Sequence, residues 1–502
     1  MLIEPAFEAF AARYLAGEPQ LVWTRLVADL ETPVSAYLRL AAGRGNAFLL
    51  ESVEGGAVRG RYSMIGLNPD LVFRAEGARA EIARLPNLAR YEPCPEDTLA
   101  ALRRLLAESR IEIPRGLPPM AAGVFGYLAY DAVRLMERLP EPNPGGIGVA
   151  DSIFIRPQIV AVFDSVKDEM TIVTPVRPRA GVSARDAYDR AVDRLSETID
   201  ALDRPLERSA ETADVSLAAE IVSNTTPDEY RAMVGRAKDY IAAGDIFQVV
   251  LSQRFEAPFP LPPFSLYRAL RRTNPAPFLY FLDFGDFAVV GSSPEILVRV
   301  REGEVTIRPI AGTRPRGPTP EEDQRLGEEL LADPKERAEH LMLLDLGRND
   351  VGRVATLGTV KVTDQFFLEH YSQVMHIVSN VVGRLREGCD ALDALVAGFP
   401  AGTVSGAPKI RAMEIIDELE KEKRGIYAGC VGYFSCDGEM DTCIVLRTAV
   451  VKDGRMYVQA GAGIVADSNP ASEQAECVAK AKALFRAGEE ARRFATQAGR
   501  GQ

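Results

Sequence analysis

Histidine is scarce in this chain: its 502 residues contain three, and all three fall between positions 340 and 376. Because imidazole is the side chain that titrates near neutral pH, we expect general acid and base chemistry to rest largely on carboxylates. The six cysteines show neither Cys-x-x-Cys pairs nor zinc-ligand spacing, which predicts reduced, buried thiols. No Gly-x-Ser-x-Gly elbow, P-loop or Cys-His signature occurs, which argues against the common hydrolases and NTPases.

Long apolar runs and basic blocks are also absent. No run approaches the roughly 20 apolar residues of a membrane helix, and Glu4 and Glu8 interrupt the first apolar stretch, which argues against a signal peptide. The net charge of −12, without a basic block, argues against nucleic-acid and membrane-surface binding. The composition, 47% hydrophobic and 26% charged, is typical of a globular protein, and we expect it to be cytoplasmic.

Helical and strand-like segments are interspersed along the chain and suggest two units. Residues 1–202 contain candidate strands at 47–52 and 152–163 and an amphipathic helix at 188–202. A charged linker rich in Ala, Ser and Thr follows at 203–222, and the second unit spans 223–490. We predict an α+β fold in which antiparallel β-sheets pack as a sandwich with helices on the outer faces, and the N-terminal unit embraces the larger C-terminal one.

Two acidic helices are the first sign of a functional site. The segment 333–350 starts with Asp-Pro, a helix-start signal, and places Glu336 and Glu339 on one face with core residues. The segment 467–485 repeats this arrangement with three charged residues on one face: Glu473, Glu476 and Lys480. Like charges on a mostly apolar helix cost stability unless a cation or proton joins them. Neither helix has the Glu-x-x-His of a di-iron site, so the pattern favours Mg²⁺, against the simpler interpretation of glutamates that complement a helix dipole.

Four further segments have the composition of ligand-binding loops. Residues 308–317 form a predicted loop with three arginines, a glycine and a threonine, and residues 371–382 carry His376. Residues 401–409 form a small-residue loop that leads into a helix start, a natural place for an anion. Residues 461–463 read Gly-Ala-Gly after a strand. Each segment by itself is more often a plain turn or a solvent-exposed loop.

Together these segments resemble one family, the chorismate-utilising enzymes, and within it the anthranilate synthase component I branch. The matching runs span most of residues 225–485: GDIFQVVLSQRF, GSSPE, RPIAGTRPRG, KERAEHLMLLDLGRND, VMHIVSNVVG, AGTVSGAPK, TCIVLRTA, QAGAGIV and SEQAE. The runs LLES and RYSMIG extend the likeness into the first unit. The resemblance implies a chorismate-binding catalytic domain at 223–490 and a regulatory or structural domain at 1–202.

The resemblance also implies which residues bind the metal and the substrate. Glu339 and Glu476 would ligate Mg²⁺, which would hold the ring carboxylate of chorismate, with Glu336 and Glu473 close by. An arginine fork matches a carboxylate, and Arg447, with Tyr427, would bind the enolpyruvyl carboxylate. The remaining substrate contacts would come from Gly312, Thr313, Gly461, Ala462, Gly463 and Lys480.

The implied reaction is amination of the chorismate ring at C2 with loss of the C4 hydroxyl, through 2-amino-2-deoxyisochorismate. Elimination of pyruvate then gives anthranilate, in the first committed step of tryptophan biosynthesis. A hydroxyl is a poor leaving group, so an acid must protonate it. Glu295, in the GSSPE run, is the candidate general acid, with His376 near the departing oxygen; Glu336 and Thr403 complete the expected catalytic set.

Two positions separate the branches of this family. Isochorismate and salicylate synthases carry lysine where this chain has Gln248, and aminodeoxychorismate synthases commonly carry lysine where it has Ala311. Glutamine is not a base and alanine is not a nucleophile, so the resemblance favours ammonia as an external nucleophile. The alternatives are an aminodeoxychorismate synthase of the kind that lacks the lysine, and a protein that senses chorismate or tryptophan without catalysis.

No stretch of the chain resembles a glutamine amidotransferase. We therefore expect ammonia to come from solution or from a separate glutamine amidotransferase subunit, and the resemblance implies a heterotetramer of two large and two small subunits. It also implies inhibition by tryptophan, bound between Ser52 in the first unit and three residues of the second: Pro277, Phe278 and Leu279. Ala276 and Phe278 stand where serine and tyrosine are common in the family.

Overall fold

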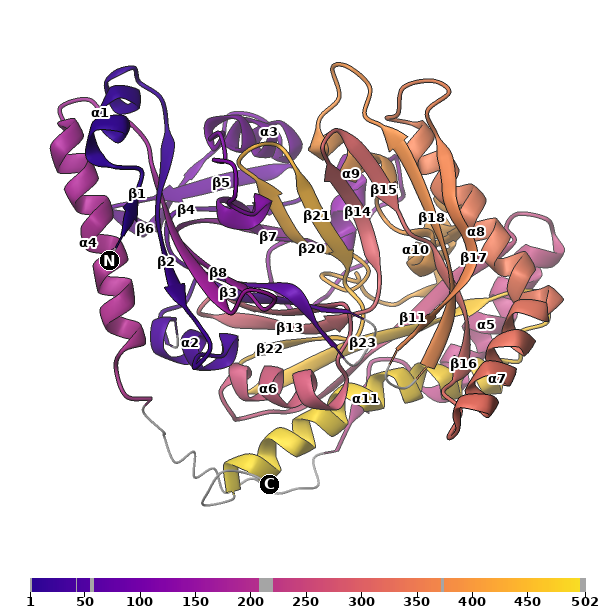
Figure 1. Cartoon of the computed structure of the whole chain (residues 1–502). Coiled ribbons are helices and arrows are strands. Elements are labelled where there is room, and N and C mark those ends of the chain that lie inside the picture. The colour runs from indigo at the N-terminus through magenta and orange to yellow at the C-terminus, as the bar shows by residue number, and fades with distance from the viewer. Residues whose placement is uncertain (1, 42, 55–57, 207–219, 372–373, 497–502) are drawn as a thin grey trace.

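The computed structural model describes residues 2–41, 43–54, 58–206, 220–371 and 374–496 (Figure 1). Its helices are α1 (Phe7–Leu15), α2 (Pro33–Leu40), α3 (Thr98–Glu108), α4 (Ala184–Leu202), α5 (Pro227–Ala242), α6 (Pro263–Thr273), α7 (Pro320–Ala332), α8 (Pro334–Gly352), α9 (Ala391–Gly398), α10 (Lys409–Leu419) and α11 (Pro470–Thr496), with short 3₁₀ helices η1 (Pro119–Ala121), η2 (Tyr130–Leu135) and η3 (Gly402–Val404). Among these described helices, none is long and apolar enough to cross a membrane.

The strands of the N-terminal unit are β1 (Ile3–Glu4), β2 (Gln20–Val27), β3 (Ala47–Glu54), β4 (Val58–Glu76), β5 (Arg79–Arg84), β6 (Asn87–Pro93), β7 (Gly123–Leu128), β8 (Ser152–Asp164) and β9 (Glu169–Val176). Those of the C-terminal unit are β10 (Val222–Ser223), β11 (Gln248–Pro258), β12 (Phe278–Asp283), β13 (Phe287–Ser293), β14 (Ile296–Arg301), β15 (Glu304–Ile307), β16 (Ile310–Pro315), β17 (Lys361–His370), β18 (Val374–Arg384), β19 (Gly406–Ala407), β20 (Cys430–Ser435), β21 (Met440–Ile444), β22 (Thr448–Lys452) and β23 (Arg455–Ile464).

These strands form two layers that share two long strands, and they pair antiparallel. One layer runs β1-β2-β9-β8-β4-β3-β12-β13-β22-β23-β11, and the other runs β6-β5-β4-β8-β7-β20-β21-β14-β15-β18. β4 and β8 belong to both layers because their register shifts between Pro69 and Leu71. Proline cannot donate a ladder hydrogen bond, and such an irregularity bends a strand, so the pair can turn from one layer into the other.

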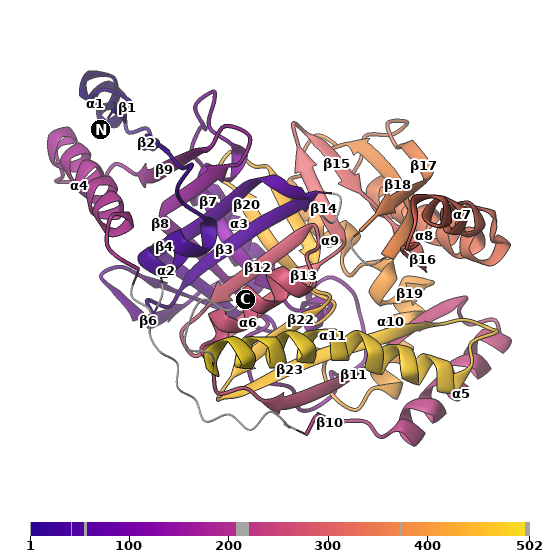
Figure 2. The ribbon, with the colours of Figure 1, turned by 60° about the horizontal axis from the view of Figure 1, so that its bottom comes forward.

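The core lies between the two layers and under the helices outside them. Large aromatic side chains fill the space between the layers: Phe48, Phe125, Tyr127, Tyr280 and Tyr433. Helices α1, α2, α4, α5, α6 and α11 pack on the first layer, as the view turned to bring the bottom forward shows (Figure 2), whereas α3, α8 and α9 pack on the second. The predicted α+β sandwich with helices on its outer faces is therefore confirmed.

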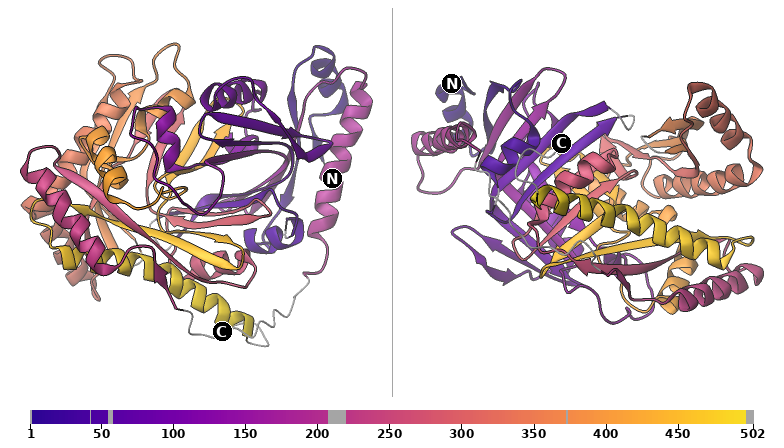
Figure 3. Two further views of the ribbon diagram at one scale, coloured as in Figure 1. Left: turned by 180° about the vertical axis from the view of Figure 1, so that it is seen from behind. Right: turned by 90° about the horizontal axis from the view of Figure 1, so that it is seen from below.

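The two predicted units are joined through both layers. Strand β3 of the N-terminal unit pairs with β12, with Leu49 opposite Phe281, and β7 pairs with β20, with Tyr127 opposite Val431. The N-terminal unit thus lies against the C-terminal unit along both layers, as the view from behind also shows (Figure 3). Most of the predicted linker, residues 207–219, lies outside the described residues, so the division into domains stays a prediction.

Strands β16–β18 and helices α7 and α8 form a lobe that projects from the rest of the molecule (Figure 3). Helix α8 begins at Pro334 and is capped, as predicted, by Asp333, whose side chain accepts hydrogen bonds from the backbone N–H groups of Lys335 (2.9 Å) and Glu336 (3.4 Å). The expectation of a loop at 308–317 was wrong for residues 310–315, which form β16 against β18. Helix α8 packs on β16 and β18.

Candidate active site

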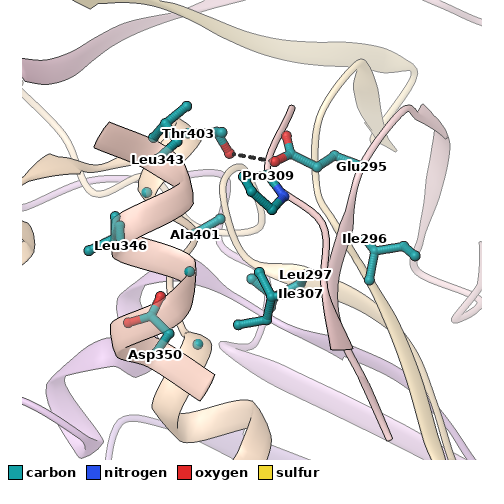
Figure 4. Close-up of a pocket in the computed structure, with 13 residues that line it drawn as sticks. Glu295, Ile296, Leu297, Ile307, Pro309, Leu343, Leu346, Asp350, Ala401 and Thr403 are labelled. Atoms are coloured by element: carbon teal, nitrogen blue, oxygen red, sulfur yellow. Dashed lines mark hydrogen bonds between the residues drawn. The ribbon is translucent and has the colours of Figure 1, made fainter. Parts of the chain in front are cut away.

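A pocket of about 670 Å³ lies where β11 and β23, the lobe with β16, β18 and α8, and the first turns of α11 meet. Its volume is within the range of small-molecule sites. A second cavity of about 30 Å³ lies behind Glu295 and against α8 (Figure 4). That cavity has room for water but not for an organic substrate, so the larger pocket is the candidate active site.

Nearly all the predicted catalytic, substrate and metal residues line this pocket. They are Glu295, Gly312, Thr313, Glu336, Glu339, His376, Thr403, Tyr427, Arg447, Gly461, Gly463, Glu476 and Lys480. Ala462 differs, because its side chain packs in the core on the opposite face of β23. Side chains alternate between the faces of a strand, so Ala462 could offer only its backbone, and that contact stays a prediction.

Glu295 is a buried acid. Its residue is 6% exposed, and the hydroxyl of Thr403 donates a hydrogen bond to its Oε1 at 3.2 Å (Figure 4). Burial raises the pKa of Glu295 to about 8, because removing the carboxylate from water disfavours its charged form. At neutral pH this carboxyl therefore holds a proton that it can give to a leaving group.

His376 is neutral, and its hydrogen bonds orient the ring. Burial lowers the pKa of His376 to about 4. Its Nδ1 lies 2.8 Å from the carbonyl oxygen of Gly312 and 3.2 Å from the hydroxyl of Thr313. A carbonyl can only accept, so Nδ1 carries the proton. Nε2 then has a free lone pair, which makes His376 an acceptor for a substrate hydroxyl and not a second acid.

The two acidic helices converge at one end of the pocket. Oε1 of Glu339 accepts a hydrogen bond from Nε2 of Gln248 at 3.2 Å, and Glu476 pairs with Lys480 at 2.7 Å. Burial raises the pKa of Glu339, and the negative charges of Glu336 and Glu476 raise it further. Carboxylates that disfavour each other's charge in this way would gain from a shared cation.

This donor set fits a hard divalent ion such as Mg²⁺. Mg²⁺ is usually bound by one or two protein carboxylates and completes its shell with water and ligand oxygens. Within the described ranges, no group of three or more His, Cys, Asp or Glu side chains forms a ready-made metal site. Glu339 and Glu476 would therefore hold the ion together with water and a carboxylate of the substrate.

Arg447 presents an uncompensated positive charge to the pocket. Burial lowers the pKa of its guanidinium, and in the described part of the chain no carboxylate forms a salt bridge with it. Arg447 is half-buried, and a cation held partly out of water without a partner is costly, so the site favours an anionic ligand. Burial raises the pKa of the nearby Tyr427, which keeps its hydroxyl as a hydrogen-bond donor.

Glycines let the backbone approach the functional side chains. A Cβ on Gly461 would lie 2.9 Å from the hydroxyl of Tyr427, and one on Gly463 would lie 2.5 Å from Nε2 of Gln248. Gly312 has a φ of +69°, a left-handed conformation that favours glycine. A side chain at any of these positions would displace a group that lines the pocket or strain the backbone.

Gln248 offers the pocket an acceptor. Its Nε2 is bonded to Glu339, and among the described residues its buried Oε1 has no hydrogen-bond partner. An orphan acceptor that lines a pocket is suited to a donor from the ligand. Ala311, the other position that separates branches of the family, lies on β16 beside Gly312 and also lines the pocket.

The arginines of the 308–317 segment do not line the pocket. Arg308 pairs with Glu369, Arg316 pairs with Asp323 at 2.7 Å, and Arg314 binds both Asp333 (2.9 Å) and Glu336 (3.0 Å). They hold the lobe together instead of binding an anion. The Arg314 contact also orients Glu336, so this arginine acts on the pocket from outside it.

The residues expected to bind tryptophan meet between the two units. Ser52 on β3 lies opposite Phe278 on β12, and Leu279 lies opposite Glu51. Pro277 directly precedes β12 and is half-buried. Glu51 forms a salt bridge at 2.8 Å with Arg271 of α6, which fixes the junction beside Ser52. The pairing brings together segments more than 200 residues apart; their role as a ligand site stays a prediction.

One buried pair behind the pocket could not be expected from sequence reasoning. Glu420 and Arg424 form a salt bridge at 2.5 Å, although α10 ends at Leu419. Spacing of four residues predicts contact only within a helix, and these two residues lie in a connecting segment. No sequence signal distinguished them from a surface pair.

Known proteins resemble this chain over most of its length. The model of the family described as "chorismate binding enzyme" matches residues 45–486. The anthranilate synthase component 1 of Cereibacter sphaeroides is 57% identical over 498 residues, which cover 99% of this chain and 100% of that protein. The protein of the same name from Pseudomonas putida is 50% identical over 466 residues, with 92% and 93% covered.

Solved structures agree with these relatives. The crystal structure of anthranilate synthase component I from Streptococcus pneumoniae has a TM-score of 0.76 and 38% identity, and the match covers 92% of this chain and 99% of that one. The menaquinone-specific isochorismate synthase of Escherichia coli, at 20% identity, shares the fold with a TM-score of 0.70. The chain therefore belongs to the chorismate binding enzymes, in the anthranilate synthase component 1 branch.

Proposed function

We propose that this enzyme converts chorismate and ammonia to anthranilate and pyruvate through 2-amino-2-deoxyisochorismate. The observation that carries the proposal is one pocket in which the protonated acid Glu295 and the unpaired cation Arg447 face the same space as two acidic helices. Chorismate has two carboxylates and a hydroxyl that must leave as water. The pocket offers an arginine for one carboxylate, a metal site for the other and an acid for the hydroxyl.

Arg447 and Tyr427 would bind the enolpyruvyl carboxylate. The guanidinium fork can donate hydrogen bonds to two carboxylate oxygens, and a phenol that keeps its proton can donate to one of them. Mg²⁺ at Glu339 and Glu476 would supply positive charge that holds the ring carboxylate and offsets the glutamates. Lys480, which donates to the carbonyl oxygen of Gly461 at 2.9 Å, ties α11 to the β23 backbone at this end of the pocket.

The first step needs acid at C4 and a nucleophile at C2. Glu295 would give its proton to the C4 oxygen while the C4–O bond breaks, so that the hydroxyl leaves as water. Ammonia would form the new C2–N bond with its lone pair, and the ring double bonds shift as the C4–O bond breaks. The nitrogen would then lose one proton to solvent, which leaves the neutral amine and balances the proton that Glu295 gave up. Oε1 of Gln248 would accept a hydrogen bond from ammonia, and Nε2 of His376 would accept one from the C4 hydroxyl. Thr403 holds the acid in place.

Ammonia would come from a separate glutamine amidotransferase component. The relatives are named component 1, which implies a second component, and this sequence contains no segment that resembles a glutaminase. We propose that two large and two small subunits assemble as a heterotetramer. Tryptophan would inhibit the enzyme from the β3–β12 junction, outside the catalytic pocket.

Product analysis tests the proposal directly. The purified chain is incubated with chorismate, Mg²⁺ and ammonium at raised pH, where free ammonia is plentiful, and the products are separated by chromatography. We expect anthranilate and pyruvate in equal amounts, and no turnover when glutamine is the only nitrogen source. Accumulation of 4-amino-4-deoxychorismate or isochorismate would assign the chain another reaction of its family. If chorismate binds but is not converted, the chain would be a sensor and not an enzyme.

A further inference from the structure

Arg424 and Glu420 form a buried ion pair directly behind the active-site pocket. Their side chains are 1% and 4% exposed. Nε of Arg424 donates to Oε2 of Glu420 at 3.0 Å and Nη2 donates to Oε1 at 2.5 Å. Burial by itself lowers the pKa of Arg424, and the Glu420 carboxylate more than reverses this, so the guanidinium stays charged.

The guanidinium of Arg424 also joins two separate parts of the backbone. Nη1 donates to the carbonyl oxygen of Val404 at 2.6 Å, and Nη2 donates to that of Val250 at 2.6 Å. Val404 belongs to η3 and Val250 to β11, and both residues line the pocket. A rigid fork can hold two carbonyls at a fixed separation, which the single nitrogen of a lysine cannot do.

Glu420 extends the same arrangement to a third wall of the pocket. Its Oε1 accepts hydrogen bonds from the backbone N–H of Ser252 (2.8 Å) and from the hydroxyl of Ser252 (2.9 Å). That hydroxyl in turn accepts a hydrogen bond from Nε2 of Gln459 at 2.8 Å. Gln459 lies on β23 and lines the pocket. The ion pair therefore connects β11, η3 and β23 from behind.

The segment that Arg424 holds carries the partner of the proposed acid. Thr403 directly precedes Val404, and its hydroxyl is the hydrogen-bond donor to Glu295 (Figure 4). On its other side η3 packs tightly on α8, because a Cβ on Gly402 would lie 2.1 Å from Leu346. The backbone at Thr403 is thus fixed between α8 and Arg424.

We propose that Arg424 and Glu420 are positioning residues for the reaction, which hold Thr403 and through it the carboxyl of Glu295 in the geometry needed to protonate the C4 oxygen. A buried ion pair contributes little net stability compared with well-packed apolar residues. The contribution of this pair is the fixed placement of three pocket walls. The inference deepens the proposed function and rests on Glu295 as the acid.

A double-mutant cycle on turnover tests this inference. The variants are Arg424→Lys, Thr403→Val and the double variant, each assayed with ammonium and with chorismate affinity measured by calorimetry. A misplacement of about 1 Å costs as much as about 100-fold in rate, and we expect Arg424→Lys to lower kcat by roughly 10- to 100-fold with much less change in the chorismate Kd. In the double variant the two effects should not multiply, because Arg424 acts through Thr403.

The matched control is Arg156→Lys. Arg156 forms a similarly buried fork with Asp70, at 2.7 and 3.0 Å, in the N-terminal unit, and its side chain is 7% exposed. This variant should lower the melting temperature as Arg424→Lys does, keep kcat, and combine with Thr403→Val by simple multiplication. If Arg424→Lys does not fold, Glu420→Gln serves in its place, since glutamine keeps the shape and one acceptor.

The outcomes separate the two proposals. The positioning role would be overturned if the reductions in kcat caused by Arg424→Lys and Thr403→Val simply multiply in the double variant, or if Arg424→Lys leaves kcat unchanged. Either result would leave Glu295 as the acid. Wild-type turnover in Glu295→Gln would overturn the acid itself. A slow Glu295→Gln combined with a non-multiplying cycle supports both.

Discussion

Ser52 on β3 and Phe278 on β12 are direct register partners across the junction of the two units. A ligand at this junction would touch both units at once, and could inhibit only by binding one arrangement of the units more tightly than another. Linkage then requires chorismate and tryptophan to weaken each other's binding by the same factor.

Ser52→Phe should make the enzyme insensitive to tryptophan. The hydroxyl of Ser52 donates to the carbonyl oxygen of Tyr62 at 3.0 Å, and a Cβ on Gly60 would lie 2.2 Å from that hydroxyl, so the space beside it is narrow. A phenylalanine ring would fill it. Activity is measured against tryptophan concentration for the parent, Ser52→Phe and Ser52→Ala. If the parent ignores millimolar tryptophan, or Ser52→Phe stays as sensitive as the parent, the ligand site lies elsewhere.

Glu295→Gln should lower turnover far more than it lowers chorismate binding. Glutamine keeps the shape of the side chain but cannot supply a proton as the C4–O bond breaks. Loss of a general acid typically costs about 10²–10⁴-fold in rate. Turnover with saturating ammonium is compared with the chorismate Kd. A collapse of affinity, with normal turnover of the substrate that still binds, would make Glu295 a binding residue.

The pH dependence of turnover should report the same carboxyl. The pKa of Glu295 is raised to about 8, so its protonated form is abundant below that pH and is lost as the pH rises through it. We expect kcat, at a constant concentration of free ammonia, to be level below about pH 8 and to fall above it. A kcat that keeps rising to pH 10 would contradict an acid with this pKa.

Activity should require Mg²⁺. Glu339→Gln and Glu476→Gln each remove one carboxylate ligand, which weakens the site of a hard cation, and both should lower activity strongly while the fold is kept. Glu490→Gln is the control on α11, the helix of Glu476, since Glu490 pairs with Arg493 and does not line the pocket. Full activity in excess EDTA would remove the metal from the mechanism.

Most of the pocket could be predicted from sequence, because its residues lie in contiguous runs. Glu336 and Glu339 share a helix face by spacing alone, and GSSPE marks Glu295 by resemblance. The direction of the Ala462 side chain could not be predicted in this way, because the run Gly-Ala-Gly does not show which residues face the pocket. Once β23 is known to be a strand, the alternation of side chains places Ala462 in the core. The arginines of 308–317 were equally ambiguous, since their carboxylate partners lie on α7, α8 and β17.

The contacts that connect the walls of the pocket could not be predicted. Arg424 binds the carbonyl oxygens of Val250 and Val404, which are separated by more than 150 residues, and a backbone carbonyl carries no sequence signal. The pairing of β3 with β12 is likewise non-local. Strand propensity identifies both segments as strands, but the choice of partner depends on how the whole sheet closes.

Strand β3 acquires its C-terminal partner only after more than half of the chain has been synthesised, and β7 only near the end of synthesis. β3 waits for residues 278–283 and β7 for residues 430–435, so each leaves an edge open while the ribosome makes the intervening chain. Unpaired edges invite association with other chains, and contacts of such long sequence separation slow folding. The N-terminal unit is therefore expected to complete its two layers only after nearly the whole chain has emerged, which makes truncated forms prone to aggregate.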